Sequence, residues 1–180
     1  MSHRAKIILA ALTVVGLICL GIGVYGISQQ SDTQAAPIDT SQIPAVDTGP
    51  APAIVGTTLT GEPFDLATYR GTPVVLNFWA SWCGPCGKEL PAIAAFAKAH
   101  PEIAVIGVDY QDDVAEAKAF ADKHGATWPS VVDDGPIGAA YKVPGLPATY
   151  LIDAQGQIVD RILGEVTEAT LEAKVPELTG

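Results

Sequence analysis

An uninterrupted apolar stretch, TPVVLNFWA at residues 72–80, leads directly into two cysteines that stand three positions apart. A continuous run of strand-forming residues of this length indicates a strand that is buried on both faces of a sheet. From Cys83 to about His100, apolar residues recur instead at helical spacing. A buried strand followed at once by a helix predicts an α/β fold in which helices pack on a sheet.

The remaining sequence continues this alternation of strands and helices. Asp113 and Glu116 have the spacing of a helix capping box, and Gly125 is placed to end that helix. The further elements are predicted as strand, helix, strand, strand, hairpin strand and helix, at residues 103–109, 112–125, 129–134, 147–153, 158–164 and 167–176. The prediction is a mixed central sheet flanked by helices.

The stretch Trp-Cys-Gly-Pro-Cys places its first thiol where a helix begins. A thiolate at Cys83 would face unpaired backbone N–H groups and the positive end of the helix dipole, which lower its pKa. Cys86 lies one turn further on, within bridging range. Gly84 leaves the approach open, and Pro85 stiffens the first turn. The pattern predicts one exposed nucleophilic thiol and one recessed resolving thiol.

Other uses of the cysteine pair are less consistent with the sequence. A structural disulfide usually closes a longer loop, because a small ring restrains the unfolded chain little. A zinc or copper site needs further soft ligands, and His100 and His124, the histidines of this region, are not at ligand spacing from the pair. We therefore predict redox chemistry at Cys83 and Cys86, without a metal or a cofactor.

Residues 7–27 carry no charge and are almost entirely apolar. As a helix this run would be about 31 Å long, close to the ~30 Å hydrocarbon core of a bilayer. Arg4 and Lys6 precede it, and only aspartates carry charge in the following 34 residues. The positive-inside rule predicts a single-pass anchor within residues 1–27 that leaves the rest of the chain outside the cytoplasm. A cleaved signal peptide is the alternative, with a weak site at residues 33–35.

Cys19 lies inside the apolar run rather than at its end, so a lipoprotein is less consistent with the sequence than an anchor, and Cys19 is interpreted as a small apolar helix residue. Residues 28–50 are rich in Ser, Gln, Thr, Asp and Pro and predict a disordered linker. Residues 51–180 are long enough for one domain.

Outside the predicted anchor, eight basic residues stand against twenty acidic ones. Such a surface argues against nucleic acid or anionic lipid headgroups as partners. We expect a membrane-anchored monomer whose partners are proteins that carry thiols or disulfides.

Three longer stretches carry a family resemblance. VVLNFWASWCGPCGKELPAI, GVDYQDD and VPGLPATYLIDAQGQIVDRILG resemble, in order and spacing, the membrane-tethered TlpA/ResA-like branch of the thioredoxins. The resemblance covers essentially all of residues 51–180 and implies a thioredoxin-like fold. It implies thiol-disulfide exchange at Cys83 and Cys86, and it is much less specific for the substrate.

The resemblance assigns further positions one by one. Pro147 matches the cis-proline of the family, so the Leu146–Pro147 segment would bind an extended substrate peptide by β-augmentation. A trans proline at the start of a strand is the alternative. Glu89 matches an active-site glutamate that could move protons at the cysteine pair, or it is a solvated acid that complements the helix dipole. Trp82 would shield the disulfide or contact substrate.

Asn77 departs from the pattern of cytoplasmic thioredoxins, which carry a buried aspartate there. An amide cannot take up a proton, so Asn77 is interpreted as a structural hydrogen-bonding residue. Pro91 matches a helix kink of the family and is interpreted as structural. Trp79 alternates with its strand neighbours and is predicted to lie in the core.

The predicted function is an extracytoplasmic thiol-disulfide oxidoreductase that reduces protein disulfides, with cytochrome c maturation as a candidate process and a membrane partner as the electron donor. Because exterior compartments are oxidising, a disulfide oxidase is the first alternative. A peroxiredoxin-like peroxidase would normally use a Thr-x-x-Cys motif, and Ser81 stands two residues before Cys83 instead. A copper-binding module that uses the pair with a histidine is the remaining alternative.

Overall fold

The apolar run that precedes the cysteines forms the central strand β4 (Val74–Trp79), and all six of its residues are buried. In the computed structural model, which describes residues 48–180, β4 pairs in parallel with β5 (Ala104–Tyr110) and antiparallel with β7 (Ala148–Ile152). A strand with neighbours on both edges and helices on both faces has no solvated side, which explains its uninterrupted apolar sequence. The prediction of a mixed sheet is confirmed.

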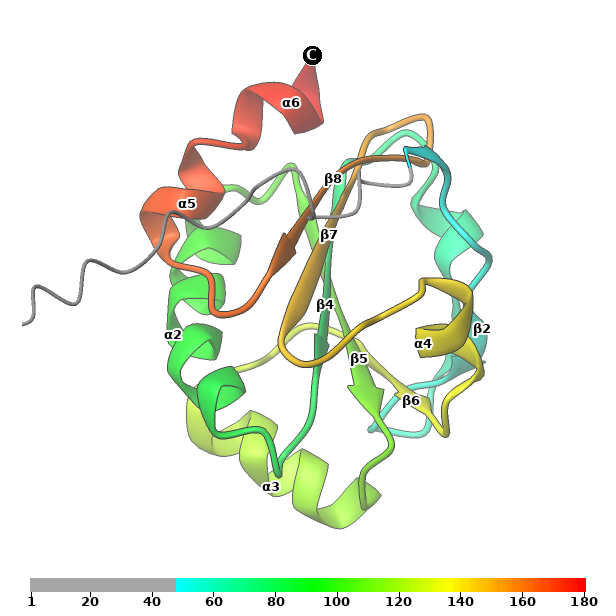
Figure 1. The fold of residues 1–180 in the computed structure, drawn as a ribbon, viewed down its shortest axis with the longest axis vertical. Coiled ribbons are helices and arrows are strands. Elements are labelled where there is room, and N and C mark those ends of the chain that lie inside the picture. The colour runs from blue at the N-terminus through cyan, green and yellow to red at the C-terminus, as the bar shows by residue number, and fades with distance from the viewer. Residues whose placement is uncertain (1–47) are drawn as a thin grey trace, which may run out of the picture. The chain divides into compact units, whose positions relative to one another are not determined.

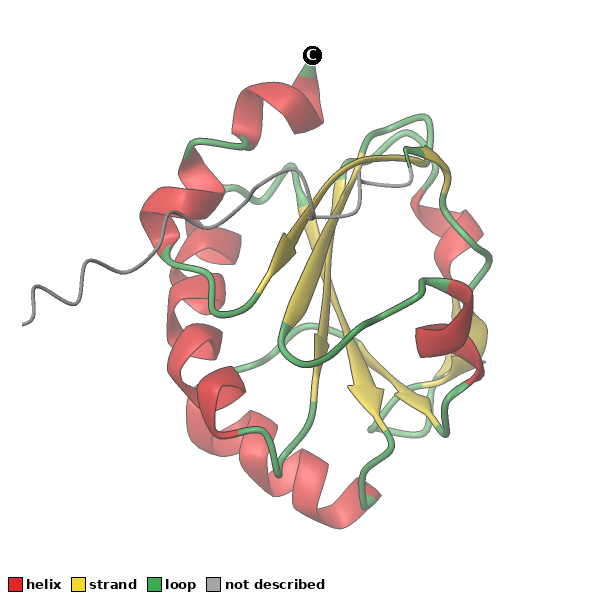
Figure 2. Cartoon of the chain, viewed as in Figure 1, coloured by secondary structure: helices red, strands yellow, loops and turns green. Residues whose placement is uncertain are grey.

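Three further strands complete the main sheet (Figures 1 and 2). The order is β1-β8-β7-β4-β5-β6, with β6 (Ser130–Asp133) parallel to β5 and β8 (Gln157–Leu163) antiparallel to β7. β1 (Gly49–Pro50) pairs antiparallel with β8. Since β1 falls at the end of the predicted linker, regular structure begins slightly earlier than the sequence indicated.

The two faces of the sheet are covered by different helices. Val75 of β4 packs in one cluster with Leu90 of α2 (Gly84–Ala99). The next residue, Leu76, packs on the opposite face, where η2 (Leu66–Tyr69) and α4 (Pro136–Ala140) contribute side chains. In Figure 1, α2 and α3 (Val114–His124) lie on one side of the sheet and α4 on the other. This alternation directs Asn77 and Trp79 toward the helix that carries the cysteines.

The predicted ends of α3 are confirmed, with one difference. The Asp113 side chain accepts hydrogen bonds from the N–H groups of Ala115 and Glu116, and Gly125 adopts a left-handed conformation at φ +75°. The backbone N–H of Asp113 donates to Oδ1 of Asp112 at 2.8 Å. The acid that satisfies this N–H therefore comes from the preceding residue, whereas a complete capping box would use Glu116.

The C-terminal helix is divided into α5 (Glu168–Glu172) and α6 (Val175–Thr179). Thr167 caps α5 through the N–H of Thr170, as its sequence position predicts. Pro176 lies in the first turn of α6, where its missing N–H is tolerated. The single helix predicted at residues 167–176 is therefore two short helices.

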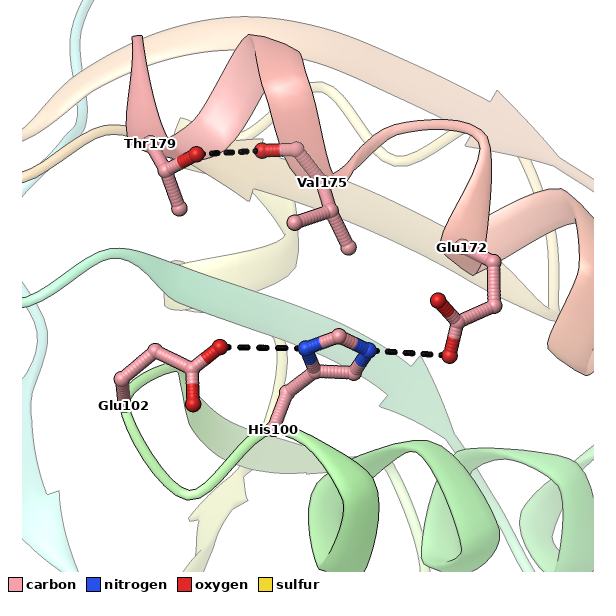
Figure 3. Close-up of polar contacts among 5 residues, drawn as sticks. All are labelled: His100, Glu102, Glu172, Val175 and Thr179. Atoms are coloured by element: carbon pink, nitrogen blue, oxygen red, sulfur yellow. Dashed lines mark hydrogen bonds and ion pairs between the residues drawn. The ribbon is translucent and has the colours of Figure 1, made fainter.

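A histidine connects the end of α2 to α5 (Figure 3). His100 lies between two carboxylates, with Nδ1 3.0 Å from Glu102 and Nε2 2.9 Å from Glu172. Hydrogen bonds to both acids raise the pKa of His100 above its ordinary value. A ring with two acceptors must donate from both nitrogens, so this contact favours the protonated imidazole.

The structure contains short elements that the sequence did not predict, namely β2 (Val55–Thr57), β3 (Pro63–Asp65), η2 and α4. Each has only three to five residues, too few for a periodic pattern to be visible. Within residues 48–180, no helix has the length and apolar character needed to cross a membrane. The predicted anchor, Cys19 and most of the predicted linker lie outside the described residues.

Candidate active site

Cys83 and Cys86 form a disulfide at the first turn of α2, with their Cα atoms 5.3 Å apart. Cys83 is the N-cap residue, and its Sγ accepts a hydrogen bond from the Cys86 N–H at 3.3 Å. The sulfur therefore occupies the position that a capping oxygen fills in other helices. Pro85 is in the first turn, as predicted. When the disulfide is reduced, this N–H and the helix dipole would stabilise negative charge on Cys83.

The prediction of an exposed Cys83 is wrong for this oxidised form. Cys83 is only 5% exposed, and Cys86 is fully buried. Both pack in a cluster with Trp79 and Ala80, and the partly buried Leu146 lies against it. Packing in this cluster buries Cys83, which a helix terminus alone would leave open. Access remains next to Gly84, where a Cβ would meet no atom within 4 Å.

Trp82 stands beside this opening and is 60% exposed. Its indole Nε1 donates to the carbonyl oxygen of Gln111 at 3.1 Å, which fixes the ring against the loop after β5. Trp79, in contrast, is fully buried and stacks on Phe120 with ring centroids 5.7 Å apart. The prediction that Trp79 lies in the core is confirmed.

The Leu146–Pro147 peptide bond is cis, as the resemblance implied, and the trans alternative is wrong. Pro147 is buried, and its carbonyl oxygen accepts a hydrogen bond from Gly164 at 2.9 Å. Leu146 is half-buried against the cluster that contains the cysteines. The segment before β7 thus lies next to the disulfide.

Glu89 lies one turn after Cys86 on α2, and it is fully buried. One carboxylate oxygen accepts from Asn77 Nδ2 at 2.8 Å, and the other accepts from the Val166 N–H at 3.0 Å. Asn77 Nδ2 also donates to Thr149 Oγ1 at 3.1 Å. The Glu89 carboxyl is therefore fixed between the central sheet and the segment that leads into α5.

Burial raises the pKa of Glu89 from 4.5 to about 7. The hydrogen bonds from Val166 and Asn77 lower the pKa but do not offset the loss of solvent, and Glu165 raises it slightly. The interpretation of Glu89 as a solvated helix-end acid is therefore wrong. A buried carboxyl with a pKa near neutrality, on the helix of a redox-active pair, is suited to accept and donate protons.

A family model described as AhpC/TSA family matches residues 48–161. The chain belongs to the AhpC/TSA family. It is 35% identical over 132 residues to the thiol-disulfide oxidoreductase ResA of Bacillus thuringiensis, an alignment that covers 72% of this chain and 76% of ResA. It is 37% identical over 122 residues to the thioredoxin-like protein YneN of Bacillus subtilis, covering 66% of this chain and 72% of YneN.

Among solved structures, a secreted disulfide oxidoreductase of Mycobacterium tuberculosis, described as homologous to Escherichia coli DsbE, is 32% identical to this chain. The two superpose with a TM-score of 0.65, over 69% of this chain and 96% of that protein. The fold is thioredoxin-like. Together with the Cys83–Cys86 disulfide, these similarities identify this AhpC/TSA family member as a thiol-disulfide oxidoreductase of the ResA and DsbE type.

The two histidines considered as metal ligands have different surroundings. His124 lies close to the cysteine pair, because a Cβ added to Gly87, the residue after Cys86, would come within 3.1 Å of its ring. His100 is at the other end of α2, between its two glutamates. Within residues 48–180, no group of three or more His, Cys, Asp or Glu side chains is arranged to hold a metal ion.

Several residues at the site were not identified from the sequence. Thr149 and the backbone of Val166 reach Asn77 and Glu89 from 72 and 77 positions away. Asp112 contacts the segment before Cys83 by accepting from Ser81 Oγ at 2.8 Å. Only the acidic stretch after the second predicted strand could have indicated Asp112. The carboxyl ends of neighbouring parallel strands lie at one edge of a sheet, so this stretch is expected near the end of β4.

Proposed function

We propose that this AhpC/TSA family member is a membrane-anchored, extracytoplasmic reductase of disulfides in client proteins. The observation that carries the proposal is the Cys83–Cys86 disulfide at the N-terminus of α2, with the N–H of Cys86 directed at Cys83 Sγ. Such a position stabilises a thiolate, and the thiolate is the form that attacks disulfides. Cys83 is the nucleophile because it is the cysteine that keeps some exposure, 5% against 0% for Cys86.

The reaction begins with the reduced enzyme. The Cys83 thiolate attacks one sulfur of a client disulfide, the client S–S bond breaks, and the departing client thiolate takes up a proton. Cys86 then loses its proton and attacks Cys83 Sγ in the mixed disulfide, which releases the second client thiol and forms the Cys83–Cys86 disulfide. Two electrons pass from the enzyme to the client. A membrane partner would return them to the enzyme.

Glu89 is proposed to handle the proton of Cys86. The two residues are three positions apart on α2 and so share one side of the helix. With a pKa of about 7, Glu89 is ionised in part of the population at neutral pH. It can therefore accept a proton when Cys86 becomes a nucleophile and return it when the enzyme is reduced again.

Client binding is proposed at the Leu146–Pro147 segment and at Trp82. An extended client peptide would pair with the backbone next to the cis bond by β-augmentation, which positions its disulfide at Cys83. Trp82 offers an exposed aromatic surface at the same opening. Apocytochrome c, whose cysteines must be reduced before haem attachment, is a candidate client on the basis of the resemblance to the TlpA/ResA-like branch.

The extracytoplasmic location rests on the uncharged run at residues 7–27 and the basic residues before it. The relative from Mycobacterium bovis, 35% identical over 126 residues, is a soluble secreted antigen, MPT53, and the M. tuberculosis oxidoreductase is also secreted. Residues 1–27 would anchor the chain, residues 28 to about 48 would act as a linker, and the thioredoxin-like domain would follow.

Single-cysteine variants test this proposal. Cys83→Ala should abolish reduction of insulin disulfides, because the attacking sulfur is absent. Cys86→Ala should also lose turnover but accumulate mixed disulfides with client proteins, which mass spectrometry would locate at Cys83. Retention of turnover by either variant would contradict the proposed chemistry. Consumption of hydrogen peroxide by the reduced enzyme, at a rate that exceeds insulin reduction, would favour the peroxidase alternative.

A further inference from the structure

A second buried acid lies on β5, the strand next to β4, opposite the last residue of β4. Asp109 is at the carboxyl end of β5, in register with Trp79, and it is fully buried. Neither of its carboxylate oxygens has a hydrogen-bond donor among the described residues. An ionised carboxylate in this position would be costly, because a buried charge without a partner loses its hydration and gains nothing in return.

Asp112, three residues further along the chain, has several hydrogen-bond donors around its carboxylate. It accepts hydrogen bonds from the backbone N–H and from the side-chain oxygen of Ser81, and from the N–H of Asp113. The adjacent carbonyl oxygen of Gln111 accepts from the indole of Trp82. Residues 111–112 therefore hold Ser81 and Trp82, the two residues that directly precede Cys83. We call these contacts the 111–112 clamp.

The Asp109 and Asp112 side chains lie within hydrogen-bonding reach of each other. Two ionised carboxylates are both acceptors and repel, so this contact is favourable only when one of them carries a proton. Asp112 already accepts three hydrogen bonds, from Ser81 and from the N–H of Asp113, whereas Asp109 accepts none. The proton accordingly belongs on Asp109, which can then donate to Asp112.

The charges around the pair reinforce this arrangement. Burial is the largest factor that raises the pKa of Asp109, from 3.8 to about 7, and Asp112, Asp113 and Asp134 raise it further. Asp113 comes from the loop before α3, and Asp134 follows β6. On the two neighbouring strands, the uncharged residues Trp79 of β4 and Val132 of β6 stand in register with Asp109. Every charged group that shifts the titration of Asp109 is therefore an acid.

We infer that Asp109 is a positioning residue for the proposed reaction, and that it shares one proton with Asp112 to hold the 111–112 clamp on the segment before Cys83. While the proton is present, the pair carries one negative charge and Asp112 remains directed at Ser81. Once the proton is lost, two negative charges face each other in a buried site. Asp112 then turns toward solvent, and Ser81 and Trp82 lose their anchor. The inference rests on the proposed function only in linking the clamp to catalysis.

The test follows the proton directly, on the full chain in detergent micelles with the disulfide oxidised. Aspartate side chains labelled with carbon-13 report the carboxyl titrations without interference from Glu89, and the amide of Ser81 reports the clamp. In the wild type we expect one aspartate to titrate near pH 7, and the Ser81 signal to shift in the same pH range.

Asp109→Asn is the informative variant, because its amide can donate to Asp112 at every pH. The titration near pH 7 should disappear, and the Ser81 signal should stay at its low-pH position. Asp134→Asn is the matched control, since it removes a neighbouring charge but leaves the shared proton, so the wild-type pattern should persist. If every aspartate of the wild type titrates below pH 5, or if Asp109→Asn leaves the Ser81 shift unchanged, the inference is wrong.

Activity gives an independent readout. The insulin reduction rate of the wild type should include a component that follows the Ser81 shift, and Asp109→Asn should lose that component while retaining turnover. An enzyme inactive on disulfides but with the expected aspartate titration would contradict the proposed function and leave the shared proton established. The titration itself needs no variant, so a failure of Asp109→Asn to fold would not prevent the test.

Discussion

Replacing Glu89 with glutamine should remove a large pH dependence from the stability of the domain. The carboxyl is buried between Asn77 and the Val166 N–H, and its pKa in the folded protein is about 7. In the unfolded chain the group returns to its ordinary value of 4.5. A carboxyl whose folded pKa is raised contributes stability below pH 4.5, and this contribution is lost as the pH rises toward 7.

The magnitude follows from the two values. One pKa unit corresponds to about 1.4 kcal/mol, so a shift from 4.5 to about 7 implies that about 3 kcal/mol of stability is lost between pH 4 and pH 8 through Glu89 alone. Glutamine does not titrate, so Glu89→Gln should lack this loss. It can keep two hydrogen bonds if the Asn77 amide turns, since Asn77 Oδ1 has no donor among the described residues.

The assay is urea unfolding of oxidised wild type and Glu89→Gln at pH 4 and pH 8. Asp109 adds a pH dependence of the same sign, but it is common to both proteins and cancels in their difference. We expect the stability of the variant, relative to the wild type, to improve by about 3 kcal/mol from pH 4 to pH 8. A difference that is the same at both pH values would show that Glu89 does not exchange its proton in this range, and its proposed role in proton transfer would be refuted.

Two further predictions concern other parts of the chain. His100→Gln should destabilise the domain more at pH 5.5 than at pH 9 in thermal unfolding, because the raised pKa of His100 contributes stability below about pH 6.5 that is lost at higher pH. Lys98→Gln, in the last turn of the same helix, is the control. An equal effect of His100→Gln at both pH values would contradict the contact in Figure 3. The full chain should remain in membranes after an alkaline wash while residues 28–180 are soluble alone, and recovery of a mature protein that begins near Ala36 would exclude the anchor.

The parts of the fold that the sequence predicted are those with long, periodic patterns. β4, α2 and α3 each contain enough residues for burial to impose a continuous or helical spacing, and the ends of α3 carry capping residues. The short β2–β3 hairpin and α4 carry no such signal. Their positions depend on packing against the sheet, for example of Phe64 and Ile137, and packing of this kind is not visible in local sequence.

At the site, too, the sequence predicted the local relations and missed the distant contacts. The relation of Cys83 to Cys86 is local, because strand end, N-cap and first helical turn are consecutive in the chain. The state of Glu89 is not local, since its burial depends on β4, β7 and the segment before α5. Helix position alone therefore left open whether Glu89 is solvated. For Cys83 the error is the opposite. The sequence predicted an exposed thiol at a helix terminus, but Leu146 packs against the cluster in which Cys83 is buried.

The reduction potential of the Cys83–Cys86 couple tests the proposed reductase most directly. The N–H of Cys86 and the helix dipole stabilise the reduced form through the Cys83 thiolate, whereas a negative charge on the nearby Glu89 opposes it. A more stable thiolate makes the couple more oxidising. Because the charge on Glu89 limits the stabilisation of the thiolate, we expect the couple to stay reducing. Equilibration with glutathione buffers should give a potential of about −230 mV or lower. A value near −120 mV would be that of a strong oxidant and would contradict a reductase.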